Sequence, residues 1–130
     1  MSTSRKFIDE LFVVIDSEKS AHVEIADAEI YSRLEANYSG FRGCELISCH
    51  SFEKDWDSWE NHPHGDEVVL LLEGNVTFLL QLDHGQTSIV LEKMGSYGIV
   101  PKNTWHTAKV HSPSKVLFIT PGEGTMLKNI

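Results

Sequence analysis

Apolar residues gather in short runs along the chain, and glycine, proline and polar residues separate these runs. Cys44–Phe52 alternates apolar and polar residues as a half-buried strand does, and Val68–Leu72 is a dense branched-aliphatic strand. Similar runs predict further strands at Leu11–Ile15, His22–Ile25, Val76–Leu82, Thr87–Leu91, Tyr97–Val100, Ala108–Val110 and Val116–Thr120. Many short strands with Gly/Pro turns indicate an all-β fold, either a closed barrel or a double-sheet jelly roll.

Turn residues predict how some of these strands are connected. Gly74-Asn75 is a two-residue hairpin signal, so Val76–Leu82 is expected to return alongside Val68–Leu72. Pro121-Gly122-Glu123-Gly124 is expected to begin a C-terminal tail.

The N-terminal part of the chain has one ambiguous stretch. The residues around Glu29–Tyr31 form a weak strand candidate. The alternative is one short helix over Ala28–Ala36, with Asp27 as its N-cap.

Length and charge limit the classes of function. A chain of 130 residues has the size of a single domain, 1–130, with a real hydrophobic core. Its formal net charge is −8, and its basic residues are scattered, with no run longer than Arg5-Lys6. A nucleic-acid surface would need clustered Lys and Arg, so no nucleic-acid partner is expected.

The sequence favours a cytoplasmic location without a membrane partner. No apolar run approaches the length of a membrane span, and Asp9-Glu10 interrupts the N-terminal apolar stretch, which makes a poor signal peptide. Cys44 and Cys49 lack a Cys-x-x-Cys spacing and are interpreted as free thiols in a reducing compartment.

Candidate chemistry is concentrated in two segments. His62, His64 and Glu67 lie within six residues, and His106 follows much later in the chain. Imidazole nitrogens and carboxylate oxygens are ligands that divalent Zn, Fe, Mn, Ni or Cu accept. If the fold brings His106 beside His62 and Glu67, the chain has a divalent-metal site.

The spacing around these residues resembles that of the cupin superfamily. Glu67 is followed after six residues by Gly74, and Gly95 is followed after five residues by Pro101-x-Asn103-x-x-His106. The resemblance covers roughly residues 45–120. It implies a cupin-type double-stranded β-helix, or jelly-roll barrel, over about residues 41–122, with an extension of short strands over about 1–40. It also implies a metal or ligand pocket inside the barrel.

Three positions depart from the family motifs. Asn103 replaces the turn glycine, which is physically mild because Asn tolerates a left-handed backbone better than most residues. Val110 replaces an asparagine that is not a metal ligand. The glycine that opens the first motif is absent, since Lys54 or Trp56 stands in its place.

The identity of a fourth ligand stays open between Glu60, His64 and water. His62-x-His64 resembles the family's His-x-His pair, but only two residues separate His64 from Glu67, fewer than the family spacing. Four residues separate His62 from Glu67, which the family spacing allows. In that alignment Glu60 takes the first position, on the strand face of Ser58 and His62, and residues 63–66 form a turn.

The resemblance implies three functional alternatives. The first is a metal-dependent enzyme of the dioxygenase, isomerase or lyase class that acts on a small molecule. The second is a non-catalytic cupin that binds a small molecule or a metal. The third is a metal-free homodimer, in which Leu11–Ile15 and His22–Ile25 cover or exchange sheet edges.

Residues around the motifs have plainer interpretations. Trp56, Trp59 and Trp105 wall a ligand pocket or pack at the core or rim, and Trp105 is expected on the outer layer. Solvated or structural roles are expected for the remaining polar candidates, which are Glu73, Tyr97, His22, His50, His84 and His111.

Overall fold

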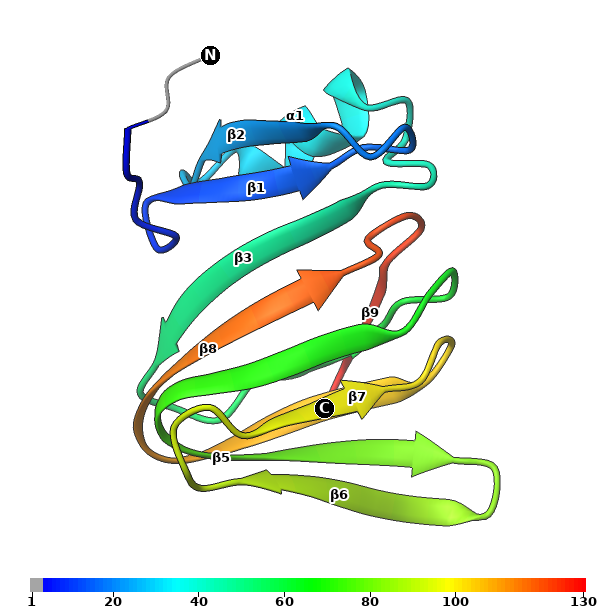
Figure 1. Ribbon diagram of the computed structural model, residues 1–130. Coiled ribbons are helices and arrows are strands. Elements are labelled where there is room, and N and C mark those ends of the chain that lie inside the picture. Colours follow the sequence, from blue (N-terminus) through cyan, green and yellow to red (C-terminus); the bar gives the residue numbers. More distant parts are fainter. Residues whose placement is uncertain (1–3) are drawn as a thin grey trace.

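The computed structural model describes residues 4–130, so the first three residues of the expected N-terminal extension lie outside the described part of the chain. The described residues form one short helix and nine strands (Figure 1). The elements are β1 (Leu11–Ile15), β2 (Ala21–Ile25), α1 (Ile30–Asn37), β3 (Glu45–Phe52), β4 (Ser58–Asn61), β5 (Glu67–Leu82), β6 (Gly85–Leu91), β7 (Tyr97–Val100), β8 (Trp105–Thr120) and β9 (Met126–Asn129). All of their pairings are antiparallel, and the predicted all-β class is confirmed.

The centre of the fold is a long two-stranded ribbon formed by β5 and β8. Each strand has 16 residues, and they pair from Val68 opposite Ile119 to Gln81 opposite Trp105. Irregular pairing between Leu71 and Val76 marks the bend of the ribbon (Figure 1). The bend folds the two halves of the ribbon over each other, so each half belongs to a different layer.

The two layers face each other across the hydrophobic core. One layer has the order β2-β1-β3-β8-β5-β7 and uses the C-terminal half of β8 with the N-terminal half of β5. The other layer, β6-β5-β8-β4-β9, uses the opposite halves. Alternate residues of both halves point inward. Together with Leu91 of β6 and Val100 of β7, they form a cluster of Val69, Leu71, Val76, Phe78, Leu80, Ala108, Val116 and Phe118.

The predicted hairpin at Gly74-Asn75 is wrong. β5 continues through these residues, and Val76–Leu82 pairs with β6 and β8 instead of returning along Val68–Leu72. Gly74 has a φ of +99°, and both a hairpin turn and a sharp bend use a glycine in that region. The same local sequence therefore suits a hairpin turn and a bend. The chain bends here because β5 pairs with β8 on both sides of Gly74.

The strand bounds differ from the expected ones mainly at the C-terminal end. Ala108–Val110 and Val116–Thr120 belong to one continuous strand, β8, although Pro113 lies between them. This proline stands at the irregular part of the ribbon, where a missing N–H donor is tolerated. The predicted tail contains β9, which pairs with β4.

The helix is confirmed as the structure of the ambiguous N-terminal stretch, but its predicted cap is wrong. The residue at the N-cap position of α1 is Glu29, whose side chain makes no capping bond. The carboxylate of Asp27 instead accepts a hydrogen bond from the Glu29 N–H and pairs with Arg33. α1 covers the inner side of β1 through Ile30 and Leu34.

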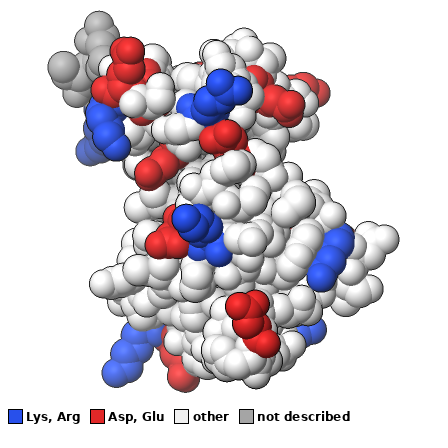
Figure 2. All heavy atoms as spheres, turned by 90° about the vertical axis from the view of Figure 1, so that its right-hand side faces the viewer, with Lys and Arg blue, Asp and Glu red and all other residues white. Residues whose placement is uncertain are grey.

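Charged side chains are dispersed over the surface. On the face drawn in Figure 2, Lys and Arg side chains are interspersed with Asp and Glu side chains, and the described residues there form no basic patch. Within residues 4–130, no helix has the length and apolar character that crossing a membrane requires.

The bend of the ribbon gives a test of the fold. A Cβ added at Gly74 would lie 2.6 Å from the Pro113 carbonyl oxygen and from Ser114 Cα, in addition to the strain of a positive φ. Gly74→Ala is therefore expected to lower the free energy of unfolding by about 2–4 kcal/mol in a urea titration. Gly40→Ala is the matched control, because Gly40 has a φ of +73° and open space around it. Equal losses in the two variants would contradict the tight packing at the bend.

Candidate metal centre

His62 lies directly after β4, and one side-chain and one backbone hydrogen bond fix its position. Its Nδ1 is 2.8 Å from Thr125 Oγ1, and that hydroxyl donates to the Gly122 carbonyl at 3.0 Å. Because the hydroxyl has one proton, the ring must donate from Nδ1 to Thr125. Nε2 is thus left to face the interior of the barrel. The His62 carbonyl also accepts from the N–H of Asn103 at 2.9 Å.

Asn103 stands where the motif that the sequence resembles has a turn glycine, and its backbone is left-handed. Its φ is +59°, the left-handed conformation expected for the residue at this position. A second bond, from the Lys102 N–H to the Asp66 carboxylate at 2.8 Å, joins the same turn to the predicted turn at residues 63–66. The two motif segments are therefore tied together by the backbone beside His62.

His106 is the second residue of β8 and is fully buried. Its Nδ1 lies 3.0 Å from the Thr104 carbonyl oxygen, and a carbonyl can only accept, so Nδ1 carries a proton. This hydrogen bond directs Nε2 toward the interior, as in His62.

Glu67 is the first residue of β5 and is also buried. The Thr120 hydroxyl donates to Oε2 at 2.6 Å, while Oε1 has no hydrogen-bond partner among the described residues. The three buried side chains are thus each oriented by a threonine, through the carbonyl of Thr104 and the hydroxyls of Thr120 and Thr125.

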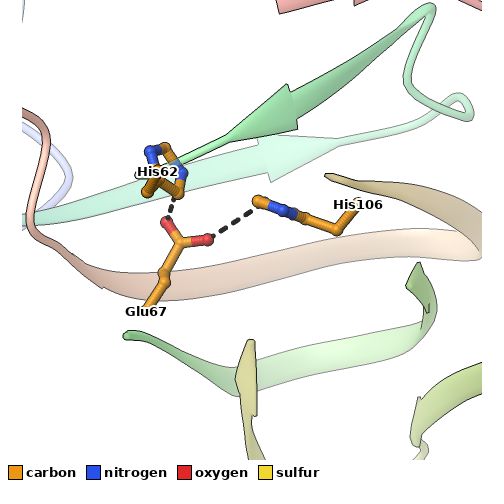
Figure 3. A group of neighbouring side chains, drawn as sticks. All are labelled: His62, Glu67 and His106. Atoms are coloured by element: carbon orange, nitrogen blue, oxygen red, sulfur yellow. Dashed lines mark ion pairs between the residues drawn. The ribbon is translucent and has the colours of Figure 1, made fainter. Parts of the chain in front are cut away.

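The three oriented side chains meet at one point (Figure 3). One ligand atom from each of His62, Glu67 and His106 lies within 4.8 Å of the others. His106 Nε2 is 3.1 Å from Glu67 Oε1, and His62 Nε2 is 3.4 Å from Oε2. These pairs are close but lack hydrogen-bond geometry, so both Nε2 atoms and Oε1 are buried without a hydrogen-bond partner in the described chain.

A divalent cation fits these unpartnered atoms. Both imidazoles donate from Nδ1, so in the neutral form each presents an Nε2 lone pair to a carboxylate, which is unfavourable without a positive charge between them. Two imidazole nitrogens and one carboxylate oxygen are a known donor set for divalent transition metals. Metal-binding side chains are usually held in position by hydrogen bonds to residues that are not ligands themselves, as here by those with Thr104, Thr120 and Thr125.

The charges of these groups influence each other strongly. Burial raises the pKa of Glu67, but the adjacent His106 and His62 rings, when they are protonated, more than offset this effect and bring that pKa to about 2. Burial lowers the pKa of His106, yet the Glu67 carboxylate and the Thr104 carbonyl leave it above its ordinary value. The carboxylate is therefore ionised throughout the neutral pH range, as a metal ligand must be.

The two candidates for a fourth ligand occupy different places. Glu60 is half-buried and directly opposite His106 in the β4–β8 pairing, so the two side chains share a sheet face. Burial and the nearby Glu67 carboxylate raise the pKa of Glu60, against smaller opposite effects of the two histidines. His64 is exposed in the turn, with its ring beside Gly124. Neither residue belongs to the group of converging ligand atoms.

Aromatic rings line the interior beside this group. The centroid of the Trp56 ring is 6.1 Å from that of His106 and 6.1 Å from that of Phe118, and Phe52 and Phe78 also contact Trp56. Trp56 Nε1 is buried and has no acceptor among the described residues. The interior thus combines apolar ring faces with a free hydrogen-bond donor.

A tyrosine that the sequence did not indicate lies near the same charges. The Tyr31 hydroxyl on α1 is 3.1 Å from His50 Nε2 on β3. Burial and the carboxylates of Glu60 and Glu67 raise the pKa of Tyr31 to about 12. Tyr31 is 57% exposed, so the contact of its hydroxyl with His50 lies at the surface of the barrel. Its sequence position gave no signal, because only the docking of α1 brings it to the site.

The remaining candidates have the solvated or structural roles that the sequence favoured. Lys128 Nζ lies over the Trp105 ring at 4.4 Å, on the outer side of the barrel. Tyr97 and Glu73 are exposed, as are His22, His84 and His111. Cys44 and Cys49 are buried free thiols.

Comparison with solved structures identifies the fold. The Bacillus subtilis oxalate decarboxylase OxdC (S161A mutant) aligns with a TM-score of 0.53 and 15% identity, over 66% of this chain and 24% of the decarboxylase. Hydroquinone 1,2-dioxygenase from Sphingomonas sp. TTNP3 aligns over 66% of this chain and 60% of its own, with a TM-score of 0.49 and 19% identity. A cupin-2 domain protein from Shewanella frigidimarina aligns over 59% and 70%, with a TM-score of 0.45 and 21% identity.

The structural neighbours are cupin-fold proteins, and this chain has the cupin fold, an all-β jelly roll. The resemblance seen in the motif spacing is thereby confirmed at the level of the fold. No protein-family model matches the chain, and no curated protein matches it. The chain spans 60% of the dioxygenase and 24% of the decarboxylase.

The Tyr31–His50 contact gives a pH-dependent prediction. Burial lowers the pKa of His50, so the unfolded chain binds this proton more tightly than the folded chain. The stability that neutral His50 contributes is present above the ordinary pKa of 6.5 and is lost as the pH falls through the lowered value. Urea titrations between about pH 7 and about pH 5 should therefore show a smaller loss of unfolding free energy in His50→Gln than in the wild type. Parallel pH dependences in the two proteins would contradict a lowered pKa of His50 in the folded chain.

Proposed function

We propose that this protein is a metal-dependent cupin enzyme that binds one divalent transition metal through His62, Glu67 and His106 and acts on a small molecule. The observation that carries the proposal is the convergence of three buried ligand atoms, each on a side chain that a threonine orients. Buried polar atoms without partners are uncommon in folded proteins, and a shared cation would satisfy all three.

The donor set favours iron, zinc, manganese or nickel. Two histidines and one carboxylate that leave open positions suit non-haem iron and also accommodate the other three ions. Such a metal, when bound, polarises a substrate oxygen or activates O2 or water, as in dioxygenases, isomerases and lyases.

Glu60 is the proposed fourth group at this site. Glu60 shares a sheet face with His106, and its pKa is raised by burial and by the charge of Glu67. His64, in contrast, is exposed in its turn. A second carboxylate adds negative charge and thereby favours harder metal ions. Water remains the alternative in the fourth position.

The surroundings of the site support a small hydroxylated substrate with an apolar body. Trp56 packs on the core beside His106, and its buried Nε1, which has no acceptor among the described residues, can donate to a substrate oxygen. The Tyr31 hydroxyl offers a second polar contact beside His50. The carboxylates of Glu60 and Glu67 disfavour a substrate of high negative charge.

A non-catalytic protein that binds a small molecule or a metal through the same residues is the second candidate. The same converging atoms support it, because metal binding alone does not require turnover. A homodimer and a cytoplasmic location remain predictions from the sequence.

Metal binding is the first test of this proposal. We expect protein purified without added metal to contain up to one transition-metal ion per chain by plasma mass spectrometry, and to reach one after reconstitution. His106→Ala should weaken metal binding by more than about 100-fold, beyond the 10–100-fold effect of changing an orienting group. His84→Ala is the matched control, since His84 is exposed on a turn. Wild-type protein that stays metal-free after reconstitution would refute the proposal.

The fourth position requires a separate comparison. Glu60→Gln is expected to lower metal affinity by about 10-fold or more, because it removes an anionic oxygen from the site, while His64→Gln leaves the affinity unchanged. Calorimetric titration of the metal-free variants measures both. A loss with His64→Gln alone would assign the fourth position to His64, and no loss with either variant would assign it to water.

A further inference from the structure

A row of paired residues leads from the metal centre to solvent across the inner face of one layer. The strand pairings give the row in the order Leu80, His106, Glu60, Leu127, on β5, β8, β4 and β9. Paired residues project from the same face of a sheet, and Leu80 belongs to the core, so all four side chains point inward. His106 is 0% exposed, Glu60 is half-buried and Leu127 is 65% exposed. The inner face is therefore uncovered where the row reaches β9.

Tyr31 reaches the same region from the other layer. Figure 1 shows that α1, which carries Tyr31, and β9 both lie behind the layer that faces the viewer. The Tyr31 hydroxyl is 3.1 Å from His50 Nε2 on the inner side of β3. Burial of this hydroxyl and the carboxylates of Glu60 and Glu67 raise the pKa of Tyr31 to about 12. Tyr31 therefore lies beside the open end of the row, within reach of the charge of Glu60.

Other sides of the metal centre are occupied by protein. The ring of His62 is bonded to Thr125 and its carbonyl to the Asn103 N–H. The Trp56 ring lies beside His106, with the two centroids 6.1 Å apart, and it packs on the hydrophobic core. A small molecule can therefore approach the three ligand atoms along the row from β9.

We propose that the metal centre is entered between β9 and α1, and that Tyr31 and Leu127 select a neutral hydroxylated molecule there. The inference rests on the proposed metal site and adds to it two residues that contact the substrate. Both lie outside the segment 41–122 that the motif resemblance assigns to the barrel, which explains why the motifs do not indicate them.

The Tyr31 hydroxyl has a free position for a substrate hydroxyl. At neutral pH Tyr31 is protonated, and His50 is neutral because burial lowers its pKa. His50 is the one hydrogen-bond partner of this hydroxyl among residues 4–130. Whichever of the two groups donates, the Tyr31 oxygen keeps at least one lone pair. It can therefore accept a hydrogen bond from a molecule that carries a hydroxyl.

Charge and exposed apolar surface define the rest of the molecule. Glu60 and Glu67 make the potential at the entrance negative, which disfavours anions. Leu127 is 65% exposed and Tyr31 is 57% exposed, and their apolar parts can contact the body of the molecule. A small neutral alcohol or phenol has both of the required features.

Relaxation of two small probes by a paramagnetic metal tests the entrance. Phenol and toluene share a ring and differ in one hydroxyl, and each is titrated into manganese(II)-reconstituted protein, with the zinc(II) form as diamagnetic reference. Both probes should be relaxed in NMR spectra, and phenol should bind more tightly. Tyr31→Phe should weaken phenol binding by about 5-fold or more through the loss of one hydrogen bond, and leave toluene binding unchanged. A merely structural role of Tyr31 would weaken both probes.

Leu127→Asn is the complementary variant, and it carries the test if Tyr31→Phe does not fold by circular dichroism. It removes an apolar contact, so it should weaken both probes by a similar factor of about 3-fold or more. Tyr97→Phe is the matched control, since Tyr97 is 64% exposed on β7 and, paired with Leu70, points away from the core. It should leave both probes unchanged.

The possible failures are distinguishable by metal content. Protein that holds manganese by plasma mass spectrometry but relaxes neither probe overturns the entrance and leaves the metal site standing. The same holds if Tyr31→Phe leaves phenol binding unchanged or weakens both probes equally, or if Leu127→Asn has no effect. Protein that takes up neither manganese nor zinc refutes the proposed function, and this inference with it.

Discussion

Pairing between β5 and β8 runs along nearly the full length of both strands, and the pair has to bend for the barrel to close. Leu80 stands opposite His106 and is thirteen residues from Glu67, a distance of about 43 Å along a straight strand. In the folded chain His106 Nε2 lies 3.1 Å from Glu67 Oε1. The bend at Gly74, where the Ser114 hydroxyl accepts from the Asn75 N–H, brings together two ends of one ribbon and thereby creates the site.

The same geometry explains why the site is both buried and oriented. Glu67 and Thr120 lie at one end of the β5–β8 ribbon, so their hydrogen bond is a direct consequence of strand register. His62 directly follows β4 and is held by Thr125, just before β9, which pairs with β4. The C-terminal strand is therefore part of the support of the site. Rigid strands hold the three side chains, which limits their reorganisation when a cation binds.

Much of the fold and the centre of the site could be predicted from the sequence, and the failures have a common cause. The position of β3 follows from the local alternation of apolar and polar residues, and those of β1 and β7 follow from short apolar runs. The residue types and spacing of the two motif segments singled out His62, Glu67 and His106. The bend at Gly74 was mistaken for a hairpin because the local backbone requirement is the same, and only pairing with a distant strand distinguishes them. Thr125 and Tyr31 were missed for a similar reason, since β9 and α1 bring them to the site from segments with weak patterns of their own.

The proposed function requires that the two imidazoles, fixed as Nδ1 donors, and the Glu67 carboxylate bind one metal ion together. X-ray absorption spectroscopy at the metal edge of the reconstituted protein tests it most directly, because imidazole rings produce a characteristic outer-shell scattering. The expected spectrum has a first shell of nitrogen and oxygen, with scattering from two imidazoles that falls to one in His62→Ala. A spectrum without imidazole scattering, or one that His62→Ala leaves unchanged, would contradict it.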